Sequence, residues 1–172
     1  GISMVCLSFL IFLPEKLILT IGLLFVFGHN SFDGVAYDGQ NIQSVVWSIL
    51  HQQQVFNFKP NHVVVILYPL VPWIGLMPLG YLFGNVYGKD FSPLTRKKWL
   101  FSYGIVALLF FVILRFLNFY GDPQPWSEQE TSIKTFLSFL NITKYPPSLV
   151  FLSMTLGPAF LLLSFFENRS NK

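Results

Sequence analysis

"WLFSYGIVALLFFVILRFLNF", residues 99–119, is the stretch that decides the fold of this chain. It is almost wholly apolar, and Arg115 is its one charged residue. A run of about 20 apolar residues is long enough to cross a bilayer as a helix. The stretch does not alternate apolar and polar residues, as a strand of a membrane barrel would. It therefore predicts a transmembrane helix.

The composition of the whole chain supports the same class of protein. Hydrophobic residues make up 53% of the 172 residues and charged residues only 11%, whereas a soluble domain carries about 25% charged residues. The net charge of +3 comes from basic residues in the short loops between apolar runs, which argues against nucleic-acid binding. Cys6 is the single cysteine, so the chain holds no internal disulfide and no cysteine-based metal spacing.

Four further apolar segments accompany residues 99–119. They are residues 1–13, 17–28, 63–87 and 146–166. The sequence thus predicts an all-α, multi-pass transmembrane helix bundle with about five spans. The first segment is shorter than a full span, so we expect it to be truncated. Residues 1–172 would then form a single transmembrane domain, the C-terminal part of a longer protein.

The third segment is unusually rich in proline and glycine. Prolines inside a helix kink it, and Gly80 and Gly84 form a GxxxG pattern typical of close helix packing. The segment therefore predicts either a bent packing helix or a helix that lines a cavity.

The basic residues indicate an orientation. Seven of them fall on one side of the expected bundle: Lys16, Lys89, Arg96, Lys97, Lys98, Arg169 and Lys172. Three fall on the other side: Lys59, Lys134 and Lys144. By the positive-inside rule, loop 88–98 and the C-terminus are cytoplasmic, and loops 29–62 and 120–145 are extracytoplasmic. We expect a short amphipathic helix within 41–56 and an interfacial helix over 131–142.

Arg115 is the strongest candidate for a functional residue, because an ionisable group inside a membrane is costly. It could be structural, with a side chain that reaches the interface or pairs with Asp122 or Asp33. It could instead bind an anionic group of a substrate. We expect an outer mouth of the bundle at the extracytoplasmic ends of the apolar segments 99–119 and 146–166. The candidate substrate-binding residues there are Arg115, Asn118, Tyr120, Asp122 and Lys144.

Two weaker sets of candidates remain. His29 and Asp33 could form an acid–base pair, or His29 could simply be a favourable residue at a helix C-terminus. His51 and His62 look isolated, so no metal site is expected. Three basic residues could attract the phosphates of a coenzyme A or act only as a topology signal: Arg96, Lys97 and Lys98.

Four blocks of the chain carry a family resemblance. They are "GHNSFDG" (28–34), "YPLVPWIGLMPLGYLFG" (68–84), "LRFLNFYGDPQPW" (114–126) and "SFLNITKYPPSLVFLSMTLGPAFLLL" (138–163). Together they resemble the heparan-α-glucosaminide N-acetyltransferase catalytic-domain-like family, in particular its bacterial multi-pass membrane proteins. The resemblance implies a transmembrane acyltransferase that moves an acetyl or acyl group from cytoplasmic acyl-CoA to an extracytoplasmic glycan or amino sugar.

The resemblance also sets the expected location and partners. It implies the bacterial inner membrane, acetyl-CoA or another acyl-CoA as co-substrate, and no metal. The histidine implicated in the family is expected upstream of Gly1. Two other classes stay open, a non-catalytic transporter or channel for an envelope precursor and a structural membrane subunit. Expected partners are the lipid bilayer and a glycan acceptor; homo-oligomerisation is left open.

Overall fold

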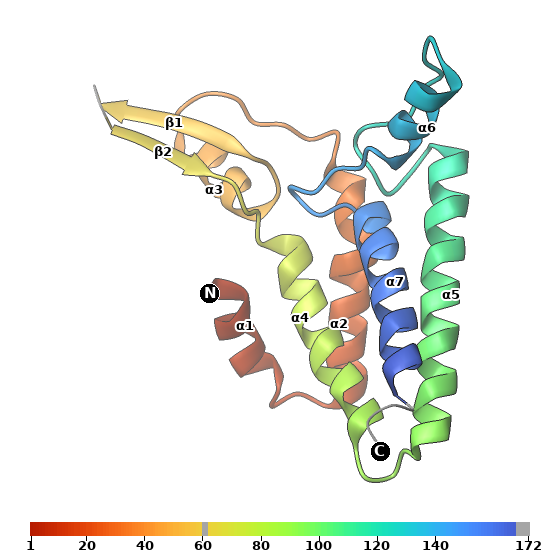
Figure 1. The fold of residues 1–172 in the computed structure, drawn as a ribbon. Coiled ribbons are helices and arrows are strands. Elements are labelled where there is room, and N and C mark those ends of the chain that lie inside the picture. The colour runs from red at the N-terminus through yellow and green to blue at the C-terminus, as the bar shows by residue number, and fades with distance from the viewer. Residues whose placement is uncertain (60–61, 168–172) are drawn as a thin grey trace. The chain divides into compact units, whose positions relative to one another are not determined.

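The computed structural model describes residues 1–59 and 62–167, and in these residues the chain is mostly helical (Figure 1). The α-helices are α1 (Ile2–Leu10), α2 (Glu15–Gly28), α3 (Ile42–Leu50), α4 (Val71–Phe83), α5 (Pro93–Leu117), α6 (Ser132–Leu140) and α7 (Leu149–Phe166). Two 3-10 helices, η1 (His29–Phe32) and η2 (Gly84–Tyr87), directly continue α2 and α4. Arg169 and Lys172, used above for orientation, lie outside the described residues, and so does the side chain of Lys59.

Two of the described helices are long and apolar enough to cross a membrane. These are α5, with 25 residues, and α7, with 18. By contrast, α1, α2 and α4 have 9, 14 and 13 residues. A helix of 14 residues is about 21 Å long, well short of the roughly 30 Å hydrocarbon core. The structure therefore does not support the expected five spans.

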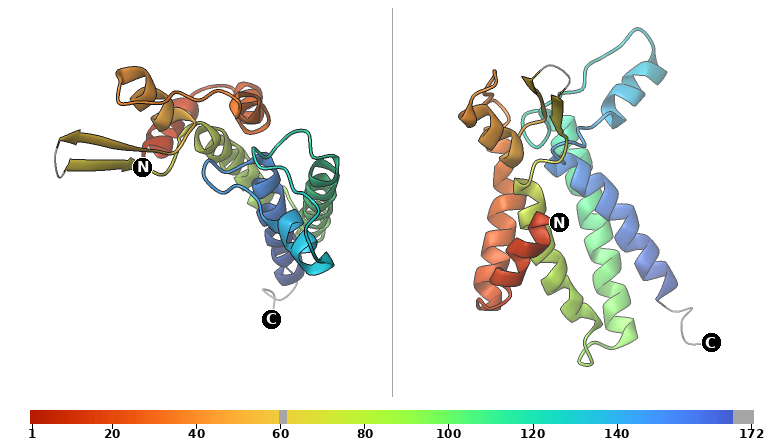
Figure 2. Two further views of the ribbon diagram at one scale, coloured as in Figure 1. Left: turned by 90° about the horizontal axis from the view of Figure 1, so that it is seen from above. Right: turned by 90° about the vertical axis from the view of Figure 1, so that its left-hand side faces the viewer.

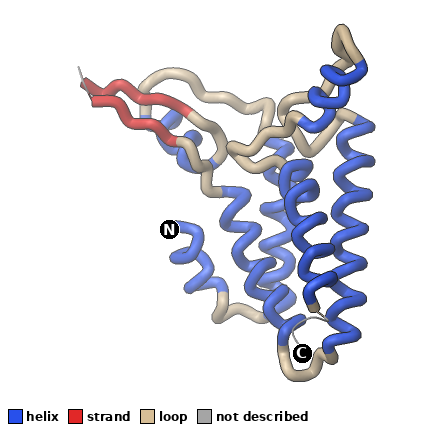
Figure 3. Tube along the Cα trace, in the orientation of Figure 1, coloured by secondary structure: helices blue, strands red, loops and turns tan. Residues whose placement is uncertain are grey.

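The expectation of an all-α chain is wrong for one segment. Residues 63–66 were expected to begin a helix, but they lie in β2 (His62–Ile66), which pairs antiparallel with β1 (Gln54–Lys59) (Figure 3). Four β-branched residues in a row, "VVVI", favour a strand over a helix. In the register of this hairpin Phe56 faces Val64, and the Phe56 side chain is fully buried.

Of the two short helices expected in the loops, the one over 131–142 is confirmed as α6, and the one over 41–56 is confirmed only as α3, because residues 54–56 lie in β1. Both helices begin at a capping residue. The Asn41 side chain accepts a hydrogen bond from the Ser44 amide at the start of α3. The Thr131 hydroxyl accepts one from the Lys134 amide at the start of α6. Such caps satisfy amides that have no partner within the helix.

The chain divides into two compact units. The first unit comprises residues 1–82 with 143–148, and the second comprises residues 83–142 with the C-terminal segment from 149. In the first unit α2 and α4 lie side by side (Figures 1 and 2). They approach at Gly22 and Gly75, where a Cβ added to Gly75 would lie 3.0 Å from the Gly22 carbonyl oxygen and 2.6 Å from the Phe25 Cβ. Only glycines allow this approach.

The second unit is built around α5 and α7, which run side by side in opposite directions (Figures 1 and 2). Their backbones approach at Gly104 and Gly157: a Cβ on Gly104 would lie 2.6 Å from the Leu161 Cγ and 3.0 Å from the Gly157 carbonyl oxygen. The Ser164 hydroxyl donates to the Lys97 carbonyl at 3.0 Å and ties one end of the pair. Small residues at such contacts are typical of helix packing in membranes.

The expected packing at the GxxxG pattern is wrong. Gly80 and Gly84 have no atom of the described chain within 4 Å of an added Cβ. The glycines that do pack closely are Gly22 with Gly75 and Gly104 with Gly157. The two members of each pair come from different helices, so neither pair forms a GxxxG pattern. The pattern in the sequence therefore pointed to the wrong glycines.

The face of α5 that does not meet α7 is apolar and exposed. Its exposed side chains include Phe101, Val106, Leu109, Ile113 and Phe116. A soluble protein rarely leaves such a contiguous apolar surface uncovered, whereas lipid covers it at no cost. This surface agrees with the membrane-spanning length of α5.

The crossing at Gly104 gives a testable prediction. We expect Gly104→Ala to lower the free energy of unfolding by about 1–3 kcal/mol, because the new methyl group overlaps Leu161 and pushes α7 away. The matched control is Gly80→Ala, which meets no atom and replaces a poor helix former. Thermal unfolding in detergent measures both. Equal effects of the two substitutions would contradict the crossing.

Candidate functional site

The candidate site lies in the first unit, where α2 ends. The helical path does not stop at Gly28 but tightens into η1, which begins with His29 and is followed directly by Asp33. A ring nitrogen of His29 and a carboxylate oxygen of Asp33 lie within 4.8 Å of each other. Only 1% of the His29 surface is exposed. The first part of the site is thus a buried histidine with a carboxylate one turn later.

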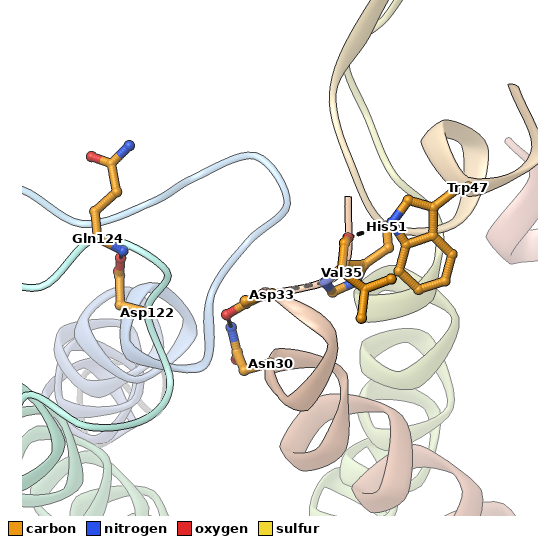
Figure 4. Close-up of polar contacts among 7 residues, drawn as sticks. All are labelled: Asn30, Asp33, Val35, Trp47, His51, Asp122 and Gln124. Atoms are coloured by element: carbon orange, nitrogen blue, oxygen red, sulfur yellow. Dashed lines mark hydrogen bonds and ion pairs between the residues drawn. The ribbon is translucent and has the colours of Figure 1, made fainter. Parts of the chain in front are cut away.

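His51, which directly follows α3, completes the site. Its Nε2 lies 3.1 Å from the Asp33 Oδ1 (Figure 4). The other carboxylate oxygen, Oδ2, accepts a hydrogen bond of 2.7 Å from the Asn30 amide group. Both oxygens of Asp33 are therefore engaged, so the carboxylate is fixed toward His51. We call His29, Asp33 and His51 the His–Asp–His cluster.

Aromatic side chains and backbone contacts hold His51 in place. The Trp47 ring centroid lies 5.3 Å from that of His51, and the Trp47 indole donates to the Val35 carbonyl at 2.8 Å (Figure 4). The Leu70 amide donates to the Ile49 carbonyl at 2.9 Å, which ties the end of α3 to the residue before α4. The position of His51 therefore depends on both α3 and α4.

His29 is the unusual member of the cluster. Neither of its ring nitrogens has a hydrogen-bond partner within the described part of the chain, and both are buried. Burial lowers the pKa of His29 to about 4, so the ring is neutral at pH 7. An unpartnered buried polar group costs about 1–3 kcal/mol. A structural role in packing alone does not explain why a histidine stands there.

A cavity of about 380 Å³ opens beside the cluster. Its lining is largely apolar and consists of Leu24, Phe25, Gly28, His29, Phe32, Trp47, Leu50, His51 and Val71. Apolar pockets with a few polar groups at one wall are typical of small-molecule sites. The two histidines supply those groups here.

The cluster also has the composition of a metal site. One ligand atom from each of its three residues can be chosen so that all lie within 4.8 Å of one another. The expectation that His51 is isolated is therefore wrong. No local spacing could have shown it, because His51 follows Asp33 by 18 residues and meets it only through the packing of α3. The proximity of His29 to Asp33, by contrast, could be expected from their closeness in the sequence.

Arg115 is held by the backbone of the second unit. Its guanidinium donates to four carbonyls, those of Phe139 (2.8 Å), Gln124 (2.8 Å), Ser138 (2.9 Å) and Asn141 (2.6 Å). The side chain is buried. A guanidinium has five N–H groups, so one remains for any ligand. This geometry favours the structural interpretation of Arg115 that the sequence left open.

The other residues of the expected outer mouth also bind the chain itself. Asn118 ends α5 in the left-handed conformation (φ 58°), and its side chain both donates to and accepts from the backbone of Trp126. The Asp122 Oδ1 accepts from the Gln124 amide at 2.9 Å (Figure 4). Tyr120 is half-buried beside Phe119, with ring centroids 6.4 Å apart.

Lys144 is the candidate substrate-binding residue that lies outside the second unit. It belongs to the first unit, where its exposed ammonium lies 5.1 Å from the centre of the Tyr145 ring.

The basic residues at the start of α5 divide into two kinds. Arg96 forms an ion pair with Glu167 and lies over the Tyr87 ring at 5.0 Å. Lys98 is exposed. Arg96 thus has a structural role in the second unit, Lys97 is half-buried, and Lys98 is the exposed residue of the three.

The fold and the site define a mostly helical protein with two helices able to span a membrane and a buried His–Asp–His cluster. Comparison of the chain with protein families, with curated proteins and with solved structures gives no match.

The role of Arg115 can be tested by stability. We expect both Arg115→Ala and Arg115→Lys to lower the free energy of unfolding by about 3 kcal/mol, because a single ammonium cannot reach four carbonyls. The control is Lys134→Ala, which removes an exposed pair with Glu130 and should leave stability near that of the unchanged protein. Unchanged thermal stability of Arg115→Lys would contradict the structural role.

Proposed function

We propose that this chain belongs to a membrane acyltransferase that moves an acetyl or acyl group from acyl-CoA to a glycan or amino sugar. The sequence blocks that resemble the acetyltransferase family suggest this reaction. The observation that supports it best is the Asp33–His51 pair beside an apolar cavity. A carboxylate that orients an imidazole is the usual arrangement for a general base.

The cluster supplies what such a transfer needs. The acceptor amine or hydroxyl attacks the thioester carbonyl, the C–S bond breaks, and the coenzyme A thiolate leaves. His51 takes the proton that the acceptor loses, through Nδ1, because its Nε2 faces Asp33. The lining of the cavity is largely apolar, which disfavours water beside the reacting atoms and would limit hydrolysis of the acyl group.

We propose that α2 and α4 also cross the membrane, in addition to α5 and α7. With its 3-10 continuation η2, α4 reaches about 27 Å, close to the roughly 30 Å hydrocarbon core, and α2 would lead from the cytoplasmic side to the loop that begins at His29. The chain would then lie in the bacterial inner membrane, with loop 88–98 cytoplasmic. Extracytoplasmic loops 29–62 and 120–145 would place the cluster on the acceptor side.

One observation favours a different function. Pro78 lies inside α4 and Pro158 inside α7. Helices interrupted in this way also occur in transporters, where they free carbonyls to bind a substrate. A transporter for an envelope precursor is therefore the second candidate.

The acyl-transfer proposal predicts a large effect at His51. We expect His51→Ala to lower the rate of acetyl transfer by about 10²–10⁴-fold, because the step loses its general base. The measurement uses inside-out vesicles that carry the protein and enclose envelope extract as acceptor, with radiolabelled acetyl-CoA added outside, where the cytoplasmic face is exposed. His62→Ala is the matched control, since His62 lies in β2 and is exposed.

Two results would count against an acyltransferase. The first is the absence of label transfer to any extract by folded protein, which would favour the transporter. The second is transfer by His51→Ala at the rate of the His62→Ala control, which would remove His51 from the reaction.

The orientation of α5 can be tested separately. In a Cys6→Ser background, we expect a cysteine at Glu128 to react with an impermeant thiol reagent added outside. A cysteine at Lys89 should react only after permeabilisation, because Lys89 precedes α5 and Glu128 follows it. Both side chains are exposed. Labelling of Lys89→Cys from outside would reverse the proposed orientation.

A further inference from the structure

We infer that the His–Asp–His cluster binds a divalent transition-metal ion, with zinc as the ion that fits it best. Its ligands would be the imidazoles of His29 and His51 and the carboxylate of Asp33. The inference concerns what the cluster binds, and it stands whether or not the protein transfers acyl groups.

The separations of the ligand atoms suit such an ion. Zinc lies about 2.0–2.2 Å from nitrogen and carboxylate ligands, so tetrahedral ligands are about 3.3 Å apart. The Asp33 and His51 atoms are already at 3.1 Å. All three ligand atoms lie within 4.8 Å of one another, so the widest pair must close by no more than about 1.5 Å.

A second observation points to a ligand independently. His29 is 1% exposed, and neither ring nitrogen finds a partner in the described chain. Buried polar atoms in folded proteins are almost always satisfied. A metal ion held by His29 would satisfy one nitrogen with a bond that apolar neighbours cannot provide.

The surroundings of the cluster resemble those of known metal centres in one respect. Asn30 donates to the Asp33 Oδ2, which leaves Oδ1 to face the ion. Hydrogen bonds of this kind orient ligating carboxylates and raise metal affinity.

The donor set selects the class of ion. Two imidazoles and one carboxylate disfavour calcium and magnesium, which prefer oxygen ligands only. The same set can bind iron(II), but at a given site zinc binds more tightly than iron(II). Three protein ligands leave a fourth position open, as in catalytic zinc sites.

A bound ion would change the chemistry of the cluster. It would replace the contact between Asp33 and His51, and it would polarise a carbonyl oxygen or a water molecule as a Lewis acid. The metal-free state, in which Asp33 orients His51 as a general base, and the metal-bound state are therefore two alternative states of the same three residues.

Zinc binding by the purified full-length chain in detergent, without a histidine tag, tests the inference. Equilibrium dialysis with elemental analysis gives the stoichiometry and the dissociation constant, and cobalt(II) gives a visible spectrum that reports tetrahedral geometry. We expect one zinc per chain in the unchanged protein and in the His62→Ala control. Affinity should fall at least about 100-fold in His29→Leu and His51→Ala, and about 10-fold in Asn30→Ala.

Thermal unfolding of the variants, with and without zinc, distinguishes a loss of zinc binding from a loss of folding. Metal-free His29→Leu should unfold at or above the temperature of the metal-free unchanged protein, because leucine removes an unpartnered buried group. Addition of zinc should then raise the unfolding temperature of the unchanged protein only. Equal zinc affinity in all variants, or no uptake by folded unchanged protein, would overturn the inference. Neither measurement uses acyl-CoA, so the failure of one proposal is distinguishable from the failure of the other.

Discussion

The candidate site depends on the close approach of two helix backbones at Gly22 and Gly75. This approach fixes α2 against α4, and α2 carries His29 at its end. The residue before α4, Leu70, is tied by its amide to the carbonyl of Ile49, one residue before the end of α3. His51 follows α3 directly. The two histidines thus reach one another because the helices that position them meet without intervening side chains, although neither glycine touches the site.

The second unit shows how the same kind of chain accommodates a charge. Arg115 follows a run of apolar residues, and an uncompensated cation there would be very costly. The segment after α5 solves this with backbone carbonyls. Those of Ser138, Phe139 and Asn141 lie at the C-terminal end of α6, where the last carbonyls of a helix lack helical partners, and that of Gln124 lies in the loop before α6. A charge within an apolar run usually suggests function. Here it organises the loop that covers the end of the helix.

The sequence predicted those elements that depend on residues within the same segment. The apolar run 99–119 predicted α5, and the cap residues Asn41 and Thr131 mark the starts of α3 and α6. The hairpin was missed because the apolar residues 63–66 were grouped with the helix that follows, although their β-branched side chains favour a strand. The contact of His51 with Asp33 could not be predicted, since it is produced by packing between elements that no periodicity links.

The chemistry of the cluster follows from the burial of His29. In water the His29 ring would be half-protonated near pH 6.5, and its nitrogens would bind water. Behind the apolar walls of the cavity the neutral ring is favoured, and both nitrogens keep their hydrogen-bonding capacity. Asp33, by contrast, is engaged at both oxygens and is held by Asn30 and His51. A fixed carboxylate beside two imidazoles can either orient one of them as a base or join both around a cation. The state of the cluster therefore depends on whether an ion enters it.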